Sequence, residues 1–121
     1  METQPSSITE RRRSQRMESS LPVKYRNLKM ATSPASSLTR DISEGGIRFK
    51  TTEFISLACR LVVEINIPTV QRPIKAISKV AWIKRLATND QYEMGNQFLE
   101  ISKEDKAAIN EYVNRISNIS P

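Results

Sequence analysis

Apolar and polar side chains alternate along most of the chain between residues 21 and 100. A period of two is the pattern of a strand with one face buried and the other face in water. By this pattern we predict about six short strands separated by turn residues, with a turn over the ATSPASS segment. The strands cover residues 21–26, 38–42, 46–51, 59–67, 74–86 and 92–98.

The long run from residue 74 to 86 breaks its own alternation. Ala81 and Ile83 fall on one phase, whereas Val80 and Trp82 fall on the other. Either both faces of this strand are covered, or a β-bulge shifts its register. A tryptophan in an alternating run is more often part of the core than a platform that stacks a base. We therefore expect Trp82 to be buried.

Near the end of the chain, the period changes from two to that of a helix. Apolar positions recur there at spacings of three and four residues, which predicts an amphipathic helix. Just before this stretch, Ser102 and Asp105 resemble a capping box with aspartate in place of glutamate. The apolar positions of the helix are Ile109, Tyr112, Val113 and Ile116.

Several short strands followed by one helix predict an all-β barrel with an appended helix. A chain of 121 residues provides for one domain with a modest core. We expect a flexible basic arm over residues 1–20, the barrel over 21–100, and the helix and tail of the same domain over 101–121. The arm has few apolar side chains and cannot build a core of its own.

Charge is concentrated at the front of this basic chain. The net charge is +6, and the first 30 residues hold seven of the 19 Lys and Arg against three Glu. A basic segment of this kind suggests an anionic partner, which could be a nucleotide, a nucleic acid or a lipid headgroup.

Composition also argues against several classes of protein. The chain has no histidine, the commonest general base and metal ligand, so we expect neither an enzyme nor a metal or cofactor site. Its single cysteine, Cys59, cannot form an internal disulfide and fits a reducing compartment. No apolar run is long enough to span a membrane, and the first residues lack the apolar centre of a signal peptide. We therefore expect a cytoplasmic protein without membrane insertion.

Two clusters of residues point to a guanine nucleotide. Arginine side chains match phosphate oxygens and the O6/N7 edge of guanine, while a carboxylate can accept from the N1–H and N2–H of the same base. A serine adds a hydrogen bond, and glycine lets a base lie against the backbone. The first cluster is Arg11, Arg12, Arg13 and Arg16, and the second is Asp41, Ser43 and Gly46.

These clusters, in their order, resemble the motifs of a PilZ domain. The pattern Arg12-x-x-x-Arg16 precedes Leu21-Pro-Val and Asp41-x-Ser43-x-x-Gly46, and a late YEMGNQF strand and a terminal helix follow. One departure is Asn96, which stands where an apolar residue is usual. The resemblance implies a six-stranded antiparallel barrel that acts as a receptor for the bacterial messenger cyclic di-GMP, with the arginines on an arm that wraps the ligand.

Carried over to this sequence, the resemblance assigns a role to each motif residue. Arg12 and Arg16 would bind guanine and phosphate. Asp41 and Ser43 would hydrogen-bond a guanine edge, and Gly46 would let that base approach.

Arg11 stands beside the first motif arginine and is expected to contact the ligand as well. A stacked pair of cyclic dinucleotides carries four phosphate charges, which extra guanidinium groups would help to hold. We therefore expect two stacked ligand molecules per domain.

The function implied is a single-domain receptor without enzymatic activity. It would signal through an unidentified effector protein, in the regulation of motility, the cell surface or biofilm. One alternative is a basic barrel that binds single-stranded nucleic acid, which seven aromatic residues on mainly core-facing positions do not favour. The other is a barrel of the same fold that ignores the messenger, and the intact motifs argue against it.

Overall fold

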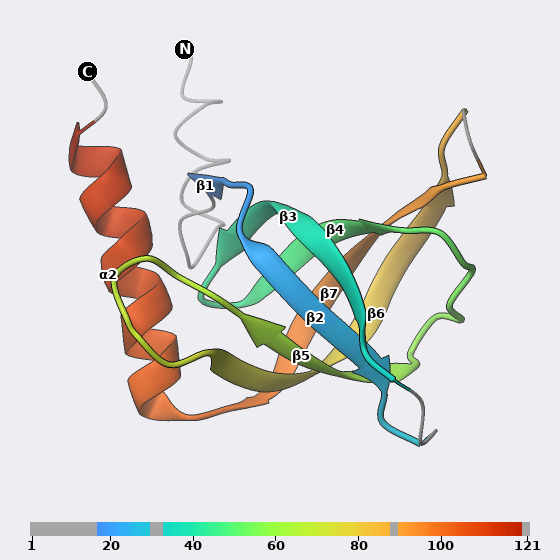
Figure 1. Cartoon of the computed structure of the whole chain (residues 1–121), viewed down its shortest axis with the longest axis horizontal. Coiled ribbons are helices and arrows are strands. Elements are labelled where there is room, and N and C mark those ends of the chain that lie inside the picture. The colour runs from blue at the N-terminus through green and yellow to red at the C-terminus, as the bar shows by residue number, and fades with distance from the viewer. Residues whose placement is uncertain (1–16, 30–32, 88–89, 120–121) are drawn as a thin grey trace, which may run out of the picture.

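The computed structural model describes residues 17–29, 33–87 and 90–119 of the chain. Six strands form an antiparallel barrel, a two-residue strand lies beside it, and one long helix packs against it (Figure 1). The elements are β1 (Met17–Glu18), β2 (Pro22–Asn27), β3 (Ala35–Ser43), β4 (Gly46–Thr51), β5 (Arg60–Ile65), β6 (Ile74–Arg85), β7 (Tyr92–Ile101) and α2 (Lys103–Ile119).

The barrel closes because β3 pairs with β2 on one side and with β4, the last strand of the order, on the other. The order around the barrel is β3, β2, β5, β6, β7 and β4, and β3 pairs again with β4. All of these pairs are antiparallel. Closure removes the open edges that an unclosed sheet would have at β3 and β4. The predicted six-stranded barrel with an appended helix is therefore confirmed.

Most of the core consists of apolar positions that the alternating pattern predicted. Helix α2 adds Ile109 and Val113 to the core, as the spacing of its apolar residues predicted. Among the described residues, no helix is both long and apolar enough to cross a membrane. The largest fully buried side chains of the barrel are Phe49, Ile42, Ile47, Leu61, Ile65, Ile74 and Met94.

Tyr25 lies at the edge of this core. Its ring packs against Phe49, with the ring centroids 4.9 Å apart. Burial raises the pKa of the Tyr25 phenol above its ordinary value, and the negative charge of Glu53 raises this pKa further. The phenol is therefore neutral under physiological conditions and can stay in the core.

The start of α2 is fixed to the barrel by its cap and by one carboxylate. The Ser102 Oγ accepts a hydrogen bond from the Asp105 N–H at 3.1 Å, which is the forward half of the predicted capping box. The Asp105 carboxylate instead forms an ion pair with Arg72 and accepts from the Lys75 N–H at 3.2 Å. The loop between β5 and β6 is thereby tied to α2, and it passes alongside the helix in Figure 1.

Strand β3 begins earlier than the sequence pattern predicted. Residues 35–37 were expected to lie in a turn, but they belong to β3 and pair with Val23, Lys24 and Tyr25 of β2. The prediction was wrong because serine and alanine favour a turn only weakly, and a neighbouring strand that offers hydrogen bonds overrides that preference.

Asn96, the residue where an apolar side chain is usual, points into the barrel. Its Oδ1 accepts a hydrogen bond from the Ser78 hydroxyl at 3.0 Å, and both residues are buried. The Asn96 Nδ2 has no hydrogen-bond partner among the described residues. A buried donor without a partner lowers stability, so this polar pair is a weak point of the core.

We predict that removing both polar groups together will cost less than removing one. Ser78→Ala alone leaves the whole Asn96 amide unpaired and should destabilise the fold by about 1–3 kcal/mol. The double variant Ser78→Ala/Asn96→Val leaves no buried polar group there and should be at least as stable as Ser78→Ala. Urea unfolding measures both variants, and a double variant less stable than the single one would contradict the prediction.

Candidate functional site

The segment Asp41–Gly46 forms the end of β3, a two-residue turn and the start of β4. Ser43 and Gly46 are the last pair before the turn, which consists of Glu44 and Gly45. The Ser43 Oγ accepts a hydrogen bond from the Gly45 N–H at 3.2 Å. In this structure Ser43 therefore stabilises its own turn.

Gly46 is required by the close approach of β7. A Cβ atom at this position would lie 2.1 Å from the carbonyl oxygen of Asn96. The turn itself does not demand glycine, because no glycine in the described residues has a positive φ. The structure thus gives Gly46 a packing reason, and its contact with a base stays a prediction.

Asp41 faces outward, and a register shift at Arg40 separates it from the inward-facing Thr39. Thr39 lies opposite the buried Phe49, whereas Asp41 lies opposite Arg48, so one residue of β3 is skipped. Without this shift, Asp41 would be on the same side as Thr39 and would point into the core. The Arg48 Nη2 lies 2.6 Å from the Asp41 Oδ2, so the carboxylate is paired across the two strands.

Arg48 lies between two buried carboxylates. The second carboxylate is that of Glu93 on β7, whose Oε2 lies 4.0 Å from the Arg48 Nε. This Nε has no hydrogen-bond partner among the described residues. Glu93 is also 3.7 Å from the Lys84 Nζ. Arg48 therefore contributes positive charge to both acids and shares Glu93 with Lys84, so losing it would reduce the charge compensation of two buried carboxylates.

Trp82 lies on the outer surface of the barrel, near Arg48. A register shift between Val80 and Trp82 moves the side chain to this face. The indole is 39% exposed and covers Gly95, where a Cβ atom would lie 2.2 Å from the Trp82 Nε1. The expectation of a core tryptophan was therefore wrong, because the bulge reverses the face on which residue 82 lies.

These side chains form one row across neighbouring strands, which we call the outer row. Residues directly opposite each other in an antiparallel sheet point to the same face. In the outer row, Trp82 pairs with Gly95, Gly95 with Arg48, Arg48 with Asp41, and Asp41 with Glu18. The row combines an indole, a guanidinium and two carboxylates on one face of the barrel.

Strand β1 brings the front of the described chain to the same place. It pairs with β3 at Ile42 and Asp41. The Ser19 N–H donates to the Arg40 carbonyl at 3.0 Å, and the Ser19 hydroxyl lies 2.6 Å from the Thr39 Oγ1. The last residues of the expected flexible arm are thus attached to the barrel beside the motif, which the sequence pattern did not predict.

The motif arginines Arg11, Arg12 and Arg16 lie outside the described residues. Met17, the residue that follows Arg16 in the sequence, lies opposite Ile42. The structure therefore fixes where the arm joins the barrel, and the arginine contacts stay a prediction.

A hollow of about 330 Å³ opens beside the outer row. We call it the arginine hollow, and it is lined by Glu18, Ser19, Ser20, Arg40 and Arg48. It presents the Arg40 guanidinium, the Glu18 carboxylate and the Arg48 guanidinium that is paired with Asp41, and its two hydroxyls can donate or accept hydrogen bonds. This combination suits an anion that also carries a hydrogen-bonding edge.

The described residues of the site offer charged groups and hydrogen-bonding groups. Among the described residues, no three His, Cys, Asp or Glu side chains gather closely enough to hold a metal ion. The Ser43 hydroxyl bonds to the Gly45 amide, and in the described part of the chain no general base contacts it. A serine without such a base is a poor nucleophile.

The sequence contained a signal for Arg48 that the analysis of motifs did not use. In a hairpin with a two-residue turn, the positions before and after the turn pair in order. With Glu44 and Gly45 as the turn, Asp41 must lie opposite Arg48, as it does. For Trp82 the signal was the broken alternation of residues 74–86, and the bulge that was one of its two interpretations is confirmed by the register shift between Val80 and Trp82.

Comparison with known proteins identifies the fold. The sequence model of the family described as PilZ domain matches residues 10–115. No curated protein sequence gives a match.

Solved structures with the same fold share little sequence with this chain. The Bacillus subtilis inhibitor of motility MotI/DgrA superposes with a TM-score of 0.77 at 22% identity, over 90% of this chain and 52% of its own. The PilZ domain with c-di-GMP of YcgR from Escherichia coli gives a TM-score of 0.67 at 16% identity, over 91% and 94% of the two chains. The K. pneumonia MrkH–c-di-GMP complex gives 0.70 at 16% identity, over 90% and 53%. The chain thus spans about half the length of MotI/DgrA and MrkH.

The two buried glycines should differ in their tolerance of alanine. Gly46→Ala would overlap the main chain of β7, which cannot move away, and should destabilise the fold by about 1–3 kcal/mol. Gly95→Ala would meet only the half-exposed indole of Trp82. It should cost less and should shift the tryptophan emission to longer wavelength.

Urea unfolding followed by circular dichroism measures the first effect, and fluorescence of the only tryptophan in the chain measures the second. An equal loss of stability in both variants, with unchanged emission, would contradict this interpretation.

Proposed function

Because this chain belongs to the PilZ domain family, we propose that it is a receptor for cyclic di-GMP that passes its signal to a partner protein. The observation that carries the proposal is the pairing of β1 with β3. It brings the residues that directly follow the arginine motif beside Asp41, although the two motifs are far apart in the sequence. The resemblance to PilZ structures that contain c-di-GMP supports the same ligand.

Asp41 is proposed to accept the N1–H and N2–H of one guanine. Its carboxylate already holds Arg48, but the two oxygens of a carboxylate can accept about four hydrogen bonds. Arg48 can therefore stay in place, orient the carboxylate and reduce its negative charge while the base binds. Ser43 can accept from Gly45 and still donate its own proton to the ligand.

Arg12 and Arg16 are proposed to bind the phosphates and the free edge of guanine. In this view the arm closes over the arginine hollow, which already presents Arg40 and Arg48. The ligand would then be held from two sides, by the arm and by the barrel. Ordering a segment in this way is a common switch, because it changes the surface that a partner contacts.

Trp82 is proposed to stack on a second guanine. Three strand spacings separate it from Asp41 in the outer row, a span of about 14 Å that one base cannot bridge. The base on Trp82 would therefore differ from the base on Asp41. It would belong either to the other half of the same ligand or to a second, stacked molecule, as expected from the cluster of arginines.

We further propose that the chain has no enzymatic activity and acts in the cytoplasm. The lack of histidine and the single cysteine support both points. Regulation of motility, the cell surface or biofilm is the process that the family suggests.

The first prediction concerns affinity. Arg16→Ala and Asp41→Asn should each weaken binding of cyclic di-GMP by about 1–3 kcal/mol, or about five- to 150-fold, because each removes a directed contact to the ligand. Arg60→Ala is the matched control, since Arg60 lies on β5 and is exposed, and it should bind like the parent. Titration calorimetry measures affinity and stoichiometry together.

A single-stranded oligonucleotide titrated in parallel tests the nucleic-acid alternative. If the parent binds the oligonucleotide with steep salt dependence and ignores cyclic di-GMP, the proposed function is wrong. If the parent binds the messenger but Arg16→Ala and Asp41→Asn bind it equally well, the assignment of the site is wrong.

A further prediction concerns Trp82. Stacking of a guanine on the exposed indole should quench its fluorescence at saturating cyclic di-GMP, and this tryptophan is the only one in the chain. Trp82→Ala should weaken binding by about 1–3 kcal/mol, as expected for the loss of one stacked base, while Trp82→Phe should retain most of the affinity. Emission that stays unchanged at saturation would show that the indole does not contact the ligand.

A further inference from the structure

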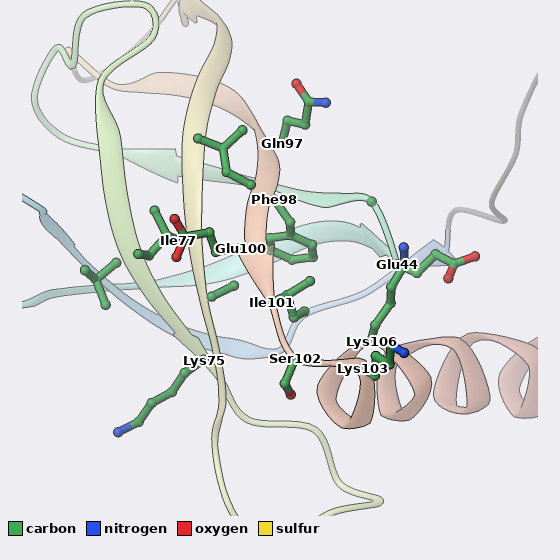
Figure 2. A pocket seen from close by; sticks show the side chains of 14 residues that line it. Glu44, Lys75, Ile77, Gln97, Phe98, Glu100, Ile101, Ser102, Lys103 and Lys106 are labelled. Atoms are coloured by element: carbon green, nitrogen blue, oxygen red, sulfur yellow. The ribbon is translucent and has the colours of Figure 1, made fainter.

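A second hollow, of about 780 Å³, lies against the turn between β3 and β4 (Figure 2). It is bounded by the turn residues Glu44 and Gly45, by β6 and β7, and by the first turn of α2. It shares no lining residue with the arginine hollow. The turn of the ligand motif is therefore a wall of a separate surface.

Part of this hollow is apolar. The ring of Phe98 lies next to Ile101 in Figure 2, and Ile77 lies farther along the hollow, beyond Glu100. Leu99, which also lines the hollow, is 40% exposed. Apolar side chains gathered in an open hollow favour contact with an apolar group of another molecule.

Three lysines belong to the lining of this surface, which we call the lysine hollow, and in Figure 2 Lys75 extends away from Phe98. Lys103 and Lys106 project from α2 on the side of Glu44, and Lys75 projects from β6 (Figure 2). All three are exposed, and no ion pair joins any of them to a carboxylate in the described part of the chain. With Glu44 and Glu100 included, the lysine hollow keeps an excess of positive charge.

The lysine hollow is joined to the ligand motif by two hydrogen bonds. The Gly45 N–H donates to the Ser43 hydroxyl at 3.2 Å, and the Gly45 carbonyl accepts from the Phe98 N–H at 2.9 Å. A ligand that bonds to Ser43 thus acts on the residue that holds Phe98. The two surfaces therefore meet at a single turn.

We propose that the lysine hollow docks a segment of a partner protein that presents one apolar side chain flanked by carboxylates. The inference rests on the proposed function, because cyclic di-GMP at Ser43 is what would change the affinity for that segment. The apolar side chain would lie against Phe98 and Leu99, and its carboxylates would meet Lys103 and Lys106.

A nucleic acid fits the lysine hollow less well than an acidic peptide segment does. Glu44 and Glu100 stand among the lysines and would repel a continuous chain of phosphates. A peptide can place its few carboxylates opposite the lysines and keep them away from the two glutamates.

The experiment selects binding peptides from a random phage-displayed library on the full chain saturated with cyclic di-GMP. The expected result is enrichment of peptides with Asp or Glu next to a large apolar residue. Fluorescence anisotropy then measures one labelled peptide against the variants. Lys103→Glu/Lys106→Glu should weaken its binding about tenfold, because two attractions become repulsions. Lys24→Glu/Lys29→Glu, the same charge change away from the lysine hollow, should have little effect.

Leu99→Ala should also weaken peptide binding, and withdrawal of cyclic di-GMP should change the peptide affinity of the parent. Enriched peptides without acidic residues, equal effects of the two double variants, or stronger competition by a uridine oligonucleotide than by the unlabelled peptide would each overturn the proposal. Calorimetry of cyclic di-GMP on the same variants separates the two hypotheses. Intact messenger binding without peptide binding at the lysine hollow rejects only this inference, whereas a parent that does not bind the messenger rejects the proposed function.

Discussion

The pairing of β3 with β4 is the interaction on which both the fold and the site depend. It closes the barrel, and the same register places Asp41 opposite Arg48. Because side chains alternate with a period of two, a slip of one residue would move Asp41 into the core and Ile42 to the surface. The burial of Ile42 and Ile47 therefore fixes the position of the carboxylate. The hydrophobic core thus sets the geometry of the site.

Two register shifts then decide which side chains reach the outer row. The shift at Arg40 allows Thr39 to face the core while Asp41 faces outward, and the shift after Val80 turns Trp82 outward. Bulges of this kind re-aim side chains without ending a strand, and they are frequent next to functional sites. Both shifts here lead to the same face of the barrel. The outer row is thus a consequence of local irregularity within a regular sheet.

Charge compensation around Arg48 explains how two buried acids are accommodated. An acid removed from water without a partner is strongly destabilising, and Arg48 lies beside both Asp41 and Glu93. In the proposed binding role of Asp41, the ion pair with Arg48 would hold this carboxylate in its orientation before the ligand arrives. Such preorganisation reduces the cost of binding, because fewer groups must be ordered when the complex forms.

The sequence by itself determined the fold class, the apolar face of most strands, and the helix with its serine cap. These features depend on the periodicity of apolar residues and on contacts between residues close together in the chain, so they can be read without knowledge of distant partners. The sequence also located the Asp41–Gly46 turn, and the two-residue hairpin rule would have given the Asp41–Arg48 pair. The arginine contacts rest on the family motif alone, since those residues lie outside the described part of the chain.

Only the tertiary structure decided the start of β3 at Ala35, the pairing of β1 beside Asp41, and the outward position of Trp82. It also showed that Gly46 is required by the main chain of β7. Each of these depends on a strand that is distant in the sequence, and one extra residue in a strand reverses the face of every side chain after it. A local sequence pattern does not identify the distant strand that will pair with it, so these features are determined by packing within the closed barrel.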